Sequence, residues 1–380
     1  MTRHYLDHAS TSPLRPEAAE AIARCAADRG LGDPSRVHAE GRAARDLIEH
    51  AREQVAALLG TASARVVFTS GATEAVNAAT WAAADARPGA PVVCTEVEHS
   101  CVREASERWA TIHLLGVDAL GGVRLDELDG LLGAGVRPAL VHCQFANHEV
   151  GTVQPVTEVV ERCRAAGVPV HVDAAMAAGH VPVDLESLGA DLVSVSAHKL
   201  GGPSGVGALV VRRGMRIEPF ILGGAQERAR RGGMENLLGI VGFGAAAAAL
   251  ADEALAVEAA DARRRTDALL GAALAVPEIE QLGDPDRRLP HLVCVSVGGV
   301  LAEAVLLGLD RNGIAAHSGS ACSSESIEPS PILAAMGADP DRSLRLSVGW
   351  STTNGDVTAF GAAFGTVVER LRALGATEPG

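Results

Sequence analysis

Short valine-rich runs recur between residues 65 and 214, and each is followed by a segment with helical periodicity. The runs occupy 65–69, 91–95, 139–144, 168–173, 191–198 and 207–214. Helical segments such as TEAVNAATWAAADA at 73–86 separate them. Strands that are apolar throughout are typical of a sheet covered on both faces. The pattern therefore predicts an α/β fold with a large, mainly parallel sheet between helices.

The regular alternation of predicted strands and helices changes in the last third of the chain. An alanine-rich helix is expected around 240–264, followed by a strand at 291–299, a helix at 301–313, a strand at 344–350 and a last helix. This order predicts a smaller α+β domain. We expect an N-terminal segment, 1–15, that joins the small domain, a large domain at 16–255 and a small domain at 256–380. Two domains around one cleft suit a chain of 380 residues.

Charge and apolar patterning exclude several classes of protein. The net charge is −14. Proteins that bind the phosphate backbone of nucleic acids instead carry clusters of Lys and Arg. The start, MTRHYLDHAS, has no apolar core typical of a signal peptide. Acidic residues interrupt the most apolar tract, at 239–260. We expect a cytoplasmic protein that binds neither membrane nor, directly, nucleic acid.

The cysteines follow no disulfide or metal pattern. There are seven, with no Cys-x-x-Cys pair, so no metal site is expected. Cys94, Cys143 and Cys294 lie in predicted strands and read as core residues. Cys322 differs, because HSGSACSSES at 317–326 surrounds it with small and hydroxyl residues. It is predicted to be a loop cysteine with a chemical role.

Polar residues follow the predicted strands at the edge where α/β sheets bind ligands. After the first strand, Ser70 and Gly71 lead into a helix beginning near Ala72 and Thr73. Free backbone N–H groups and the helix dipole would favour an anion there, although in isolation the stretch is better explained as an ordinary helix cap.

The later strand ends carry His99, Asp173, Ser196, His198 and Lys199. Lys199 is the single lysine among 33 basic residues. Arginine cannot lose its proton and form an imine, so a retained lysine after a strand indicates that chemistry.

An imine lysine, a phosphate site and an aspartate at neighbouring strand ends indicate pyridoxal 5'-phosphate. Lys199 would carry the cofactor aldehyde and Asp173 would pair with its pyridine nitrogen. His99 would stack on the ring. Thr73, Ser196 and His198 would hold the phosphate.

Several motifs together resemble the cysteine desulfurases, fold-type I enzymes of the class V aminotransferase family. The resemblance runs nearly end to end, and the pairing of the SAHK and SGSAC segments is specific. The motifs are YLDHASTSP at 5–13, GDPSRVHAEG at 32–41, FTSGATEAVN at 68–77, TEVEH at 95–99, ANHEVGTVQP at 146–155, HVDAAMAAG at 171–179, SAHKLGGPSGVGAL at 196–209, GGAQERARRGGMEN at 223–236, SGSACSS at 318–324, EPS at 328–330 and LRLSVG at 344–349.

The resemblance implies that L-cysteine is converted to L-alanine, with its sulfur held as a persulfide on Cys322. Lys199 would act as the base, and His99 would move a proton to or from the departing group. Arg345 and Asn147 would bind the substrate, Arg345 through its carboxylate. Ala72 would join Thr73 at the phosphate, and His148 would lie near the ring.

Three positions depart from the family pattern. Met176 stands where relatives usually have a glutamine that bonds the ring oxygen, and Met234 stands where they have a threonine that reaches the neighbouring subunit's phosphate. His148 replaces an asparagine. Each lost neutral hydrogen bond would cost about 0.5–1.5 kcal/mol.

The resemblance also implies partners. Relatives are homodimers that borrow the QERARRGG segment, so Arg231 is expected to reach across, and they pass sulfur to an acceptor protein. Iron–sulfur scaffolds, tRNA-thiolation or cofactor-biosynthesis proteins and DNA-phosphorothioation machinery remain open. The alternatives are another carbon–sulfur or carbon–selenium lyase such as a selenocysteine lyase, an ordinary aminotransferase, and a non-catalytic scaffold.

Overall fold

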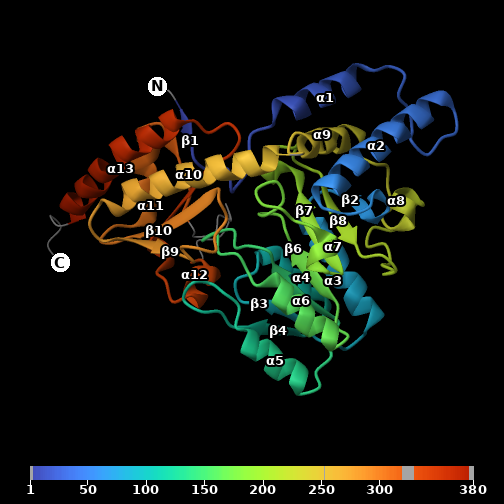
Figure 1. The fold of residues 1–380 in the computed structure, drawn as a ribbon, viewed down its shortest axis with the longest axis horizontal. Coiled ribbons are helices and arrows are strands. Elements are labelled where there is room, and N and C mark those ends of the chain that lie inside the picture. The colour runs from blue at the N-terminus through green and yellow to red at the C-terminus, as the bar shows by residue number, and fades with distance from the viewer. Residues whose placement is uncertain (1–2, 252, 319–328, 376–380) are drawn as a thin grey trace.

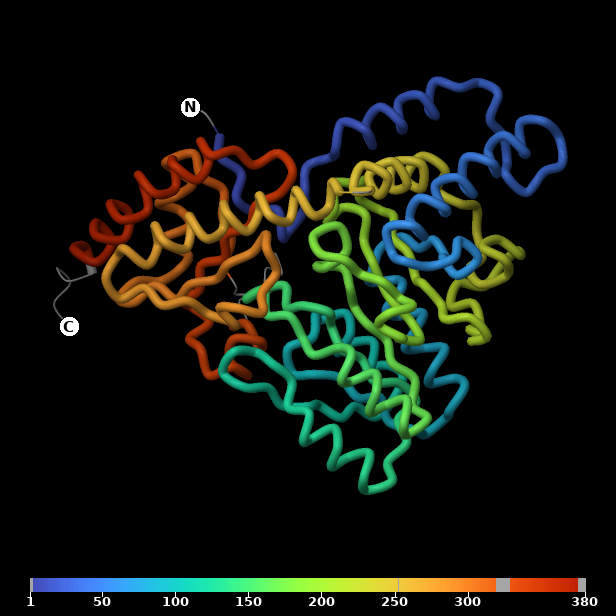
Figure 2. The backbone as a smooth tube through the Cα atoms, in the orientation of Figure 1, coloured from blue at the N-terminus to red at the C-terminus, as the bar shows by residue number. Residues whose placement is uncertain are grey.

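The computed structural model describes residues 3–251, 253–318 and 329–375. Figure 1 shows a large sheet with helices packed around it and a second, smaller group of strands and helices beside it. Helix α10 (Ala254–Leu274) runs from the large part into the small one, as the backbone trace in Figure 2 also shows.

The large sheet has seven strands in the order β2-β8-β7-β6-β5-β3-β4. Strands β7, β6, β5, β3 and β4 run parallel, while β8 is antiparallel to both of its neighbours. The α/β fold with a mainly parallel sheet is thus confirmed. The strands are β2 (Val66–Thr69), β3 (Val92–Thr95), β4 (Ile112–Leu115), β5 (Leu140–Gln144), β6 (Val170–Asp173), β7 (Leu192–Ser196) and β8 (Gly207–Val211).

Helices cover both faces of this sheet, which explains its apolar strands. Val67, Leu192 and Leu209 pack with the α3 side, whereas Val66, Val193 and Val210 face the core beneath α2, α6 and α9. Alternate residues of one strand therefore enter different cores. The helices of the large part are α1 (Pro16–Ala27), α2 (Ala39–Leu58), α3 (Ala72–Ala86), α4 (Ser100–Trp109), α5 (Leu125–Gly133), α6 (Val156–Ala165), α7 (Leu185–Leu188), α8 (Gln226–Ala229) and α9 (Leu237–Ala248), with 3₁₀ turns η1 (Ser63–Arg65) and η2 (Ala197–Lys199).

The small part is built on an antiparallel sheet in the order β12-β10-β9. Its own apolar core takes in Leu6 from the N-terminal segment, because β1 pairs with β11. The elements are β1 (His4–Tyr5), β9 (Ile279–Leu282), β10 (Leu292–Val297), α11 (Ala302–Arg311), β11 (Ile314–Ala315), α12 (Pro331–Ala335), η3 (Pro340–Arg342), β12 (Ser343–Ser347) and α13 (Asn354–Gly375).

Two features differ from the sequence prediction. The single helix expected around 240–264 is two helices, α9 and α10, and the exposed Glu253 stands at the N-cap of α10, where its carboxylate avoids the cost of burial. Strands β4 and β9 were not anticipated, because His113 and Glu280 interrupt their apolar patterns with exposed positions. The domain limits at 15 and 255 remain a proposal, and 255 falls in the first turn of α10.

Candidate active site

Lys199 ends the 3₁₀ turn that follows β7, and its side chain points to the N-terminal segment. The Nζ atom donates to the backbone oxygens of Ala9, at 2.6 Å, and Ser10, at 3.0 Å. The turn itself is fixed by His180, whose Nε2 lies 3.1 Å from the Lys199 carbonyl oxygen. The amine is thus held where the large and small parts meet.

The surroundings of Lys199 lower the pKa of its amine. Burial and, next, the Arg345 guanidinium lower the pKa, Asp7 and Asp173 raise it, and the net result is a pKa of about 8. A lysine with this pKa supplies an appreciable fraction of free amine near neutral pH. It can therefore act as a nucleophile or a base.

Arg345 reaches the same place from β12 in the small part. Its guanidinium donates to Asp7 Oδ1 at 3.0 Å, to Ser10 Oγ at 2.6 Å and to the His148 backbone oxygen at 2.9 Å. The Nε atom is buried and has no partner among the described residues. A buried, unpaired N–H on a cation is suited to an incoming carboxylate.

Asp173 and His99 lie at the ends of β6 and β3. Asp173 Oδ1 accepts from the Ser194 hydroxyl and the Ala175 backbone N–H. His99 Nδ1 accepts from the Cys101 backbone N–H at 3.1 Å, which leaves the proton of the neutral ring on Nε2. Burial lowers the pKa of His99, Asp173 opposes this and Lys199 reinforces it.

His148 faces His99, and the two ring centroids are 5.0 Å apart. Burial and the neighbouring His99 lower the pKa of His148 well below its usual range. Asn147 is fully buried, and its side chain stabilises the surrounding backbone. Its Oδ1 accepts from the N–H groups of Glu149 and Val150, and its Nδ2 donates to the Val97 backbone oxygen. One Nδ2 hydrogen remains for a substrate.

The predicted phosphate site lies at the N-terminus of α3. The backbone N–H groups of Ala72 and Thr73, at the start of the 15-residue helix α3, have no acceptor among the described residues. The Ser196 hydroxyl also lacks a partner in this part of the chain. Gly207 packs against the backbone of the turn before α3. A side chain is excluded at this position, because an added Cβ would lie 2.7 Å from the Gly71 Cα. Unpaired donors around a helix N-terminus fit a phosphate group.

His198 and Cys101 complete this region. His198 Nδ1 lies 3.2 Å from the Thr11 hydroxyl, and burial lowers its pKa to about 4, so the ring is neutral at pH 7. The Cys101 thiol is hydrogen-bonded to Thr73, but burial raises its pKa, so it is no thiolate. The donor set therefore fits pyridoxal phosphate: a lysine amine, an aspartate, a histidine ring and free N–H groups.

Several residues at the site were missed by sequence reasoning. Asp7 and Ser10 lay within a quoted motif but carried no sign that they would meet Arg345. His317 exchanges backbone hydrogen bonds with Arg345. Glu149 accepts from the Ser330 hydroxyl at 2.7 Å, and burial raises its pKa to about 7. These contacts lie far apart in sequence, which no local pattern reveals.

Other predicted residues have the following places. Cys322 lies outside the described residues, while His317 and Ser330 flank its segment and both contact the site. Met176 is buried in the large core, and Met234 is 65% exposed. Arg231 binds Glu74 of its own chain, in the first turn of α3, at 2.9 and 3.2 Å.

The described residues form no metal cluster and no membrane-spanning helix. No three His, Cys, Asp or Glu side chains in this part of the chain are grouped to hold a metal ion. Within the same residues, no helix combines the length and the apolarity needed to cross a bilayer.

Comparison with known proteins agrees with this geometry. A family model described as Aminotransferase class-V matches residues 4–360. A protein of Trichormus azollae named Cysteine desulfurase is 40% identical over 97% of this chain and 94% of its own length. Cysteine desulfurase IscS 1 of Archaeoglobus fulgidus is 38% identical, over 97% and 98% of the two chains. The solved NifS-like protein from Rickettsia africae aligns with a TM-score of 0.89 and 29% identity, over 97% of this chain and 100% of that one.

Proposed function

Because the chain belongs to the cysteine desulfurases of the class V aminotransferase family, we propose that it converts L-cysteine to L-alanine and delivers the sulfur to an acceptor. The observation that carries the proposal is the meeting of Lys199 with Arg345 at the carboxyl end of β7. An amine of lowered pKa and a buried guanidinium suit an amino acid substrate.

Different residues of the site would hold different parts of the cofactor. Asp173 would hold the ring nitrogen of pyridoxal phosphate, and the N–H groups of Ala72 and Thr73 with Ser196 and His198 would hold its phosphate. Lys199 would attach the cofactor through Nζ. When bound, the cofactor withdraws electrons from the substrate α-carbon and makes its proton acidic.

The substrate would be oriented by Arg345, whose unpaired Nε would donate to the carboxylate, with Asn147 contributing its remaining N–H. Lys199, once its amine is free, would take the α-proton. His99 would lie over the ring with Nε2 carrying a hydrogen, and would supply the proton that the carbon skeleton takes up when the carbon–sulfur bond breaks. His148 would pack beside it and help to exclude water.

Cys322 would carry the sulfur. Its thiolate attacks the substrate sulfur, so that a sulfur–sulfur bond forms while the carbon–sulfur bond breaks and its electron pair stays with the carbon skeleton. Protonation of that skeleton gives alanine, and the enzyme keeps a persulfide. Support comes from the flanking residues His317 and Ser330, which contact Arg345 and Glu149.

The partners and location are further proposals. We infer a protein acceptor, since the net charge of −14 disfavours direct contact with nucleic acid, and iron–sulfur scaffolds are the first class to try. The six described cysteines are free thiols, in keeping with a reducing cytoplasm. A homodimer is proposed from the resemblance alone, and in the single chain Arg231 has an internal partner.

The test is an assay of the purified holoenzyme with L-cysteine and a reductant, in which alanine and sulfide should appear in equal amounts. The variant Cys322→Ala should lose this activity while still binding the cofactor. Persistent desulfuration by that variant, or a strong preference for selenocysteine, would favour a lyase that needs no persulfide. Absence of any product would refute the proposal.

A further inference from the structure

A cavity of about 660 Å³ opens at the opposite edge of the large sheet from the active site. Its lining includes Ala139, Pro169 and Asp191, which directly precede β5, β6 and β7. The catalytic groups follow the strands at their other ends. The cavity is therefore separate from the cofactor site, and it is large enough for a small organic ligand.

The floor of this cavity is apolar and preformed. Ala83, Ala139, Val168 and Ala190 line it and are each at most 6% exposed. Ala83 belongs to α3, and the other three lie in the loops just before β5, β6 and β7, where they pack into the buried core. Met215 and Ile217 lie beside this floor and are only partly buried, so a ligand with an apolar body would gain from covering them.

The rim is rich in arginine. Five arginines line the cavity, against two carboxylates, in a chain whose net charge is −14. The cations are Arg65, Arg87, Arg164, Arg212 and Arg216, and the carboxylates are Glu186 and Asp191. Arg65 pairs with Glu186, and Arg212 Nε donates to Asp191 at 2.7 Å. The other three have no carboxylate partner among the described residues.

Two of these unneutralised cations are held in place by backbone oxygens. Arg164 donates to Gly189 at 2.8 Å, and Arg87 donates to Pro138 at 3.2 Å and Gly167 at 3.5 Å. Carbonyl oxygens orient a guanidinium but do not cancel its charge. Gly189 permits this approach, since its φ of +66° and the adjacent Arg164 guanidinium leave no room for a side chain.

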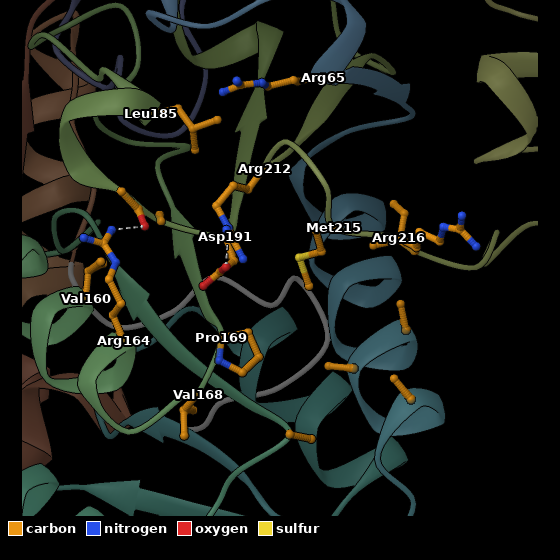
Figure 3. Close-up of a pocket in the computed structure, with 18 of the residues that line it drawn as sticks. Arg65, Val160, Arg164, Val168, Pro169, Leu185, Asp191, Arg212, Met215 and Arg216 are labelled. Atoms are coloured by element: carbon orange, nitrogen blue, oxygen red, sulfur yellow. Dashed lines mark hydrogen bonds and ion pairs between the residues drawn. The ribbon is translucent and has the colours of Figure 1, made fainter.

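Figure 3 shows how the rim is arranged around the floor. Arg65 lies at the top of the view, Arg164 on the left and Arg216 on the right, with the Arg212–Asp191 pair between them. Arg216 has no hydrogen-bond partner in the described part of the chain. Positive charge thus borders an apolar floor from two sides.

We propose that this cavity binds a small organic anion: an apolar body on the floor and a phosphate, sulfonate or carboxylate group on the arginine rim. Guanidinium forks suit such oxyanions, and the uncompensated charge supplies the attraction. The site is distinct from the cofactor site and does not depend on the proposed reaction.

The test uses 1-anilinonaphthalene-8-sulfonate as the probe, because it joins an aromatic body to one sulfonate. Titrated into the holoenzyme, it should fluoresce on saturable binding of one probe per chain. The double variant Arg87→Gln/Arg164→Gln should bind at least about tenfold more weakly, as expected for the loss of charged hydrogen bonds. Arg213→Gln, an exposed arginine outside the lining, is the matched control and should change affinity less than about twofold.

Folding and cofactor content are checked by circular dichroism and cofactor absorbance, which both variants should leave unchanged. A short polyglutamate peptide serves as a competing occupant. Equal probe binding by the wild type and the double variant would overturn the proposal, as would absence of saturable binding. Binding of the peptide through the same arginines without binding of the probe would also overturn it, in favour of a protein partner.

Discussion

The Arg345 guanidinium donates to the Asp7 carboxylate at 3.0 Å, joining β12 to the N-terminal segment directly beside Lys199. Both charges act on the lysine, and they act oppositely: Arg345 lowers its pKa and Asp7 raises it. Because the guanidinium is also the proposed carboxylate anchor, the pair links substrate binding to the protonation of the amine.

Substitutions in this pair should shift the Lys199 pKa in opposite directions. Arg345→Gln should raise it above about 8, and Asp7→Asn should lower it, each by roughly half to one pH unit. Lys199 is the only lysine, so acylation of the cofactor-free protein at a series of pH values reports its amine directly by peptide mass. Shifts of the same sign in both variants would contradict this electrostatic account.

Arg345→Gln should also raise the KM for L-cysteine by about 10- to 100-fold, because a charged hydrogen bond to a carboxylate contributes about 1.5–3 kcal/mol. Cofactor absorbance should remain normal, since Arg345 is not a proposed cofactor contact. Steady-state kinetics on the two proteins measures the change.

The resulting picture was only partly accessible from sequence. Continuous apolar runs predicted the central strands because both faces of the sheet are buried. The single lysine, together with Asp173 and Ser196 at strand ends, predicted a cofactor site at the carboxyl ends of the parallel strands. The Arg345–Asp7 contact spans 338 residues, and it arises only because β1 adds to the small part. Periodicity reports local structure and carries no record of such distant contacts.

Glu98 should make the protein less stable as the pH rises from about 4.5 to 8. Its side chain is fully buried, its Oε2 has no partner among the described residues, and burial raises its pKa to about 8. The folded state therefore keeps a proton that the unfolded state loses in this window, so unfolding free energy falls by on the order of a few kcal/mol.

Glu98→Gln should remove that part of the pH dependence while keeping the acceptor for the Gln144 N–H. Urea unfolding at several pH values compares it with the wild type, and the exposed Glu17→Gln variant is the control. An identical slope for wild type and Glu98→Gln would show that the carboxyl is already ionised in the folded protein.

The buried pair between Arg52 and Glu227 should be a large contributor to the stability of the segment around α8. Two hydrogen bonds, at 2.6 and 2.8 Å, join them, and Glu227 also accepts from the Phe68 N–H. The pair holds Glu227, Arg228 and Ala229 with φ between 50° and 60°, which is unfavourable for residues with side chains.

Glu227→Gln should cost about 3–5 kcal/mol in unfolding free energy, because the buried Arg52 guanidinium would keep only the half-exposed Glu49, 3.1 Å from its Nε, as an ion partner. The exposed pair between Arg228 and Glu49 offers a control in the same segment, and Arg228→Gln should cost less than about 1 kcal/mol. Denaturant midpoints provide the comparison. Equal losses of unfolding free energy in the two variants would mean that burial of the Arg52–Glu227 pair does not determine how much it stabilises the protein.

Met176→Gln should tighten cofactor binding. The side chain is buried beside the Asp173 turn, at the position where the resemblance expects a glutamine bonded to the cofactor ring. One regained hydrogen bond, about 0.5–1.5 kcal/mol, corresponds to roughly two- to tenfold in affinity. Titration of cofactor-free protein by absorbance measures it, and weaker binding by the glutamine variant would show that the pocket is fitted to methionine.

The central claim is that sulfur leaves L-cysteine and passes onto Cys322. The most direct measurement mixes holoenzyme with a stoichiometric pulse of L-cysteine without reductant, quantifies alanine and maps the modified peptide by mass spectrometry. The account predicts one alanine per active site and one added sulfur atom on the peptide that contains Cys322. Alanine release with that peptide unchanged would contradict it.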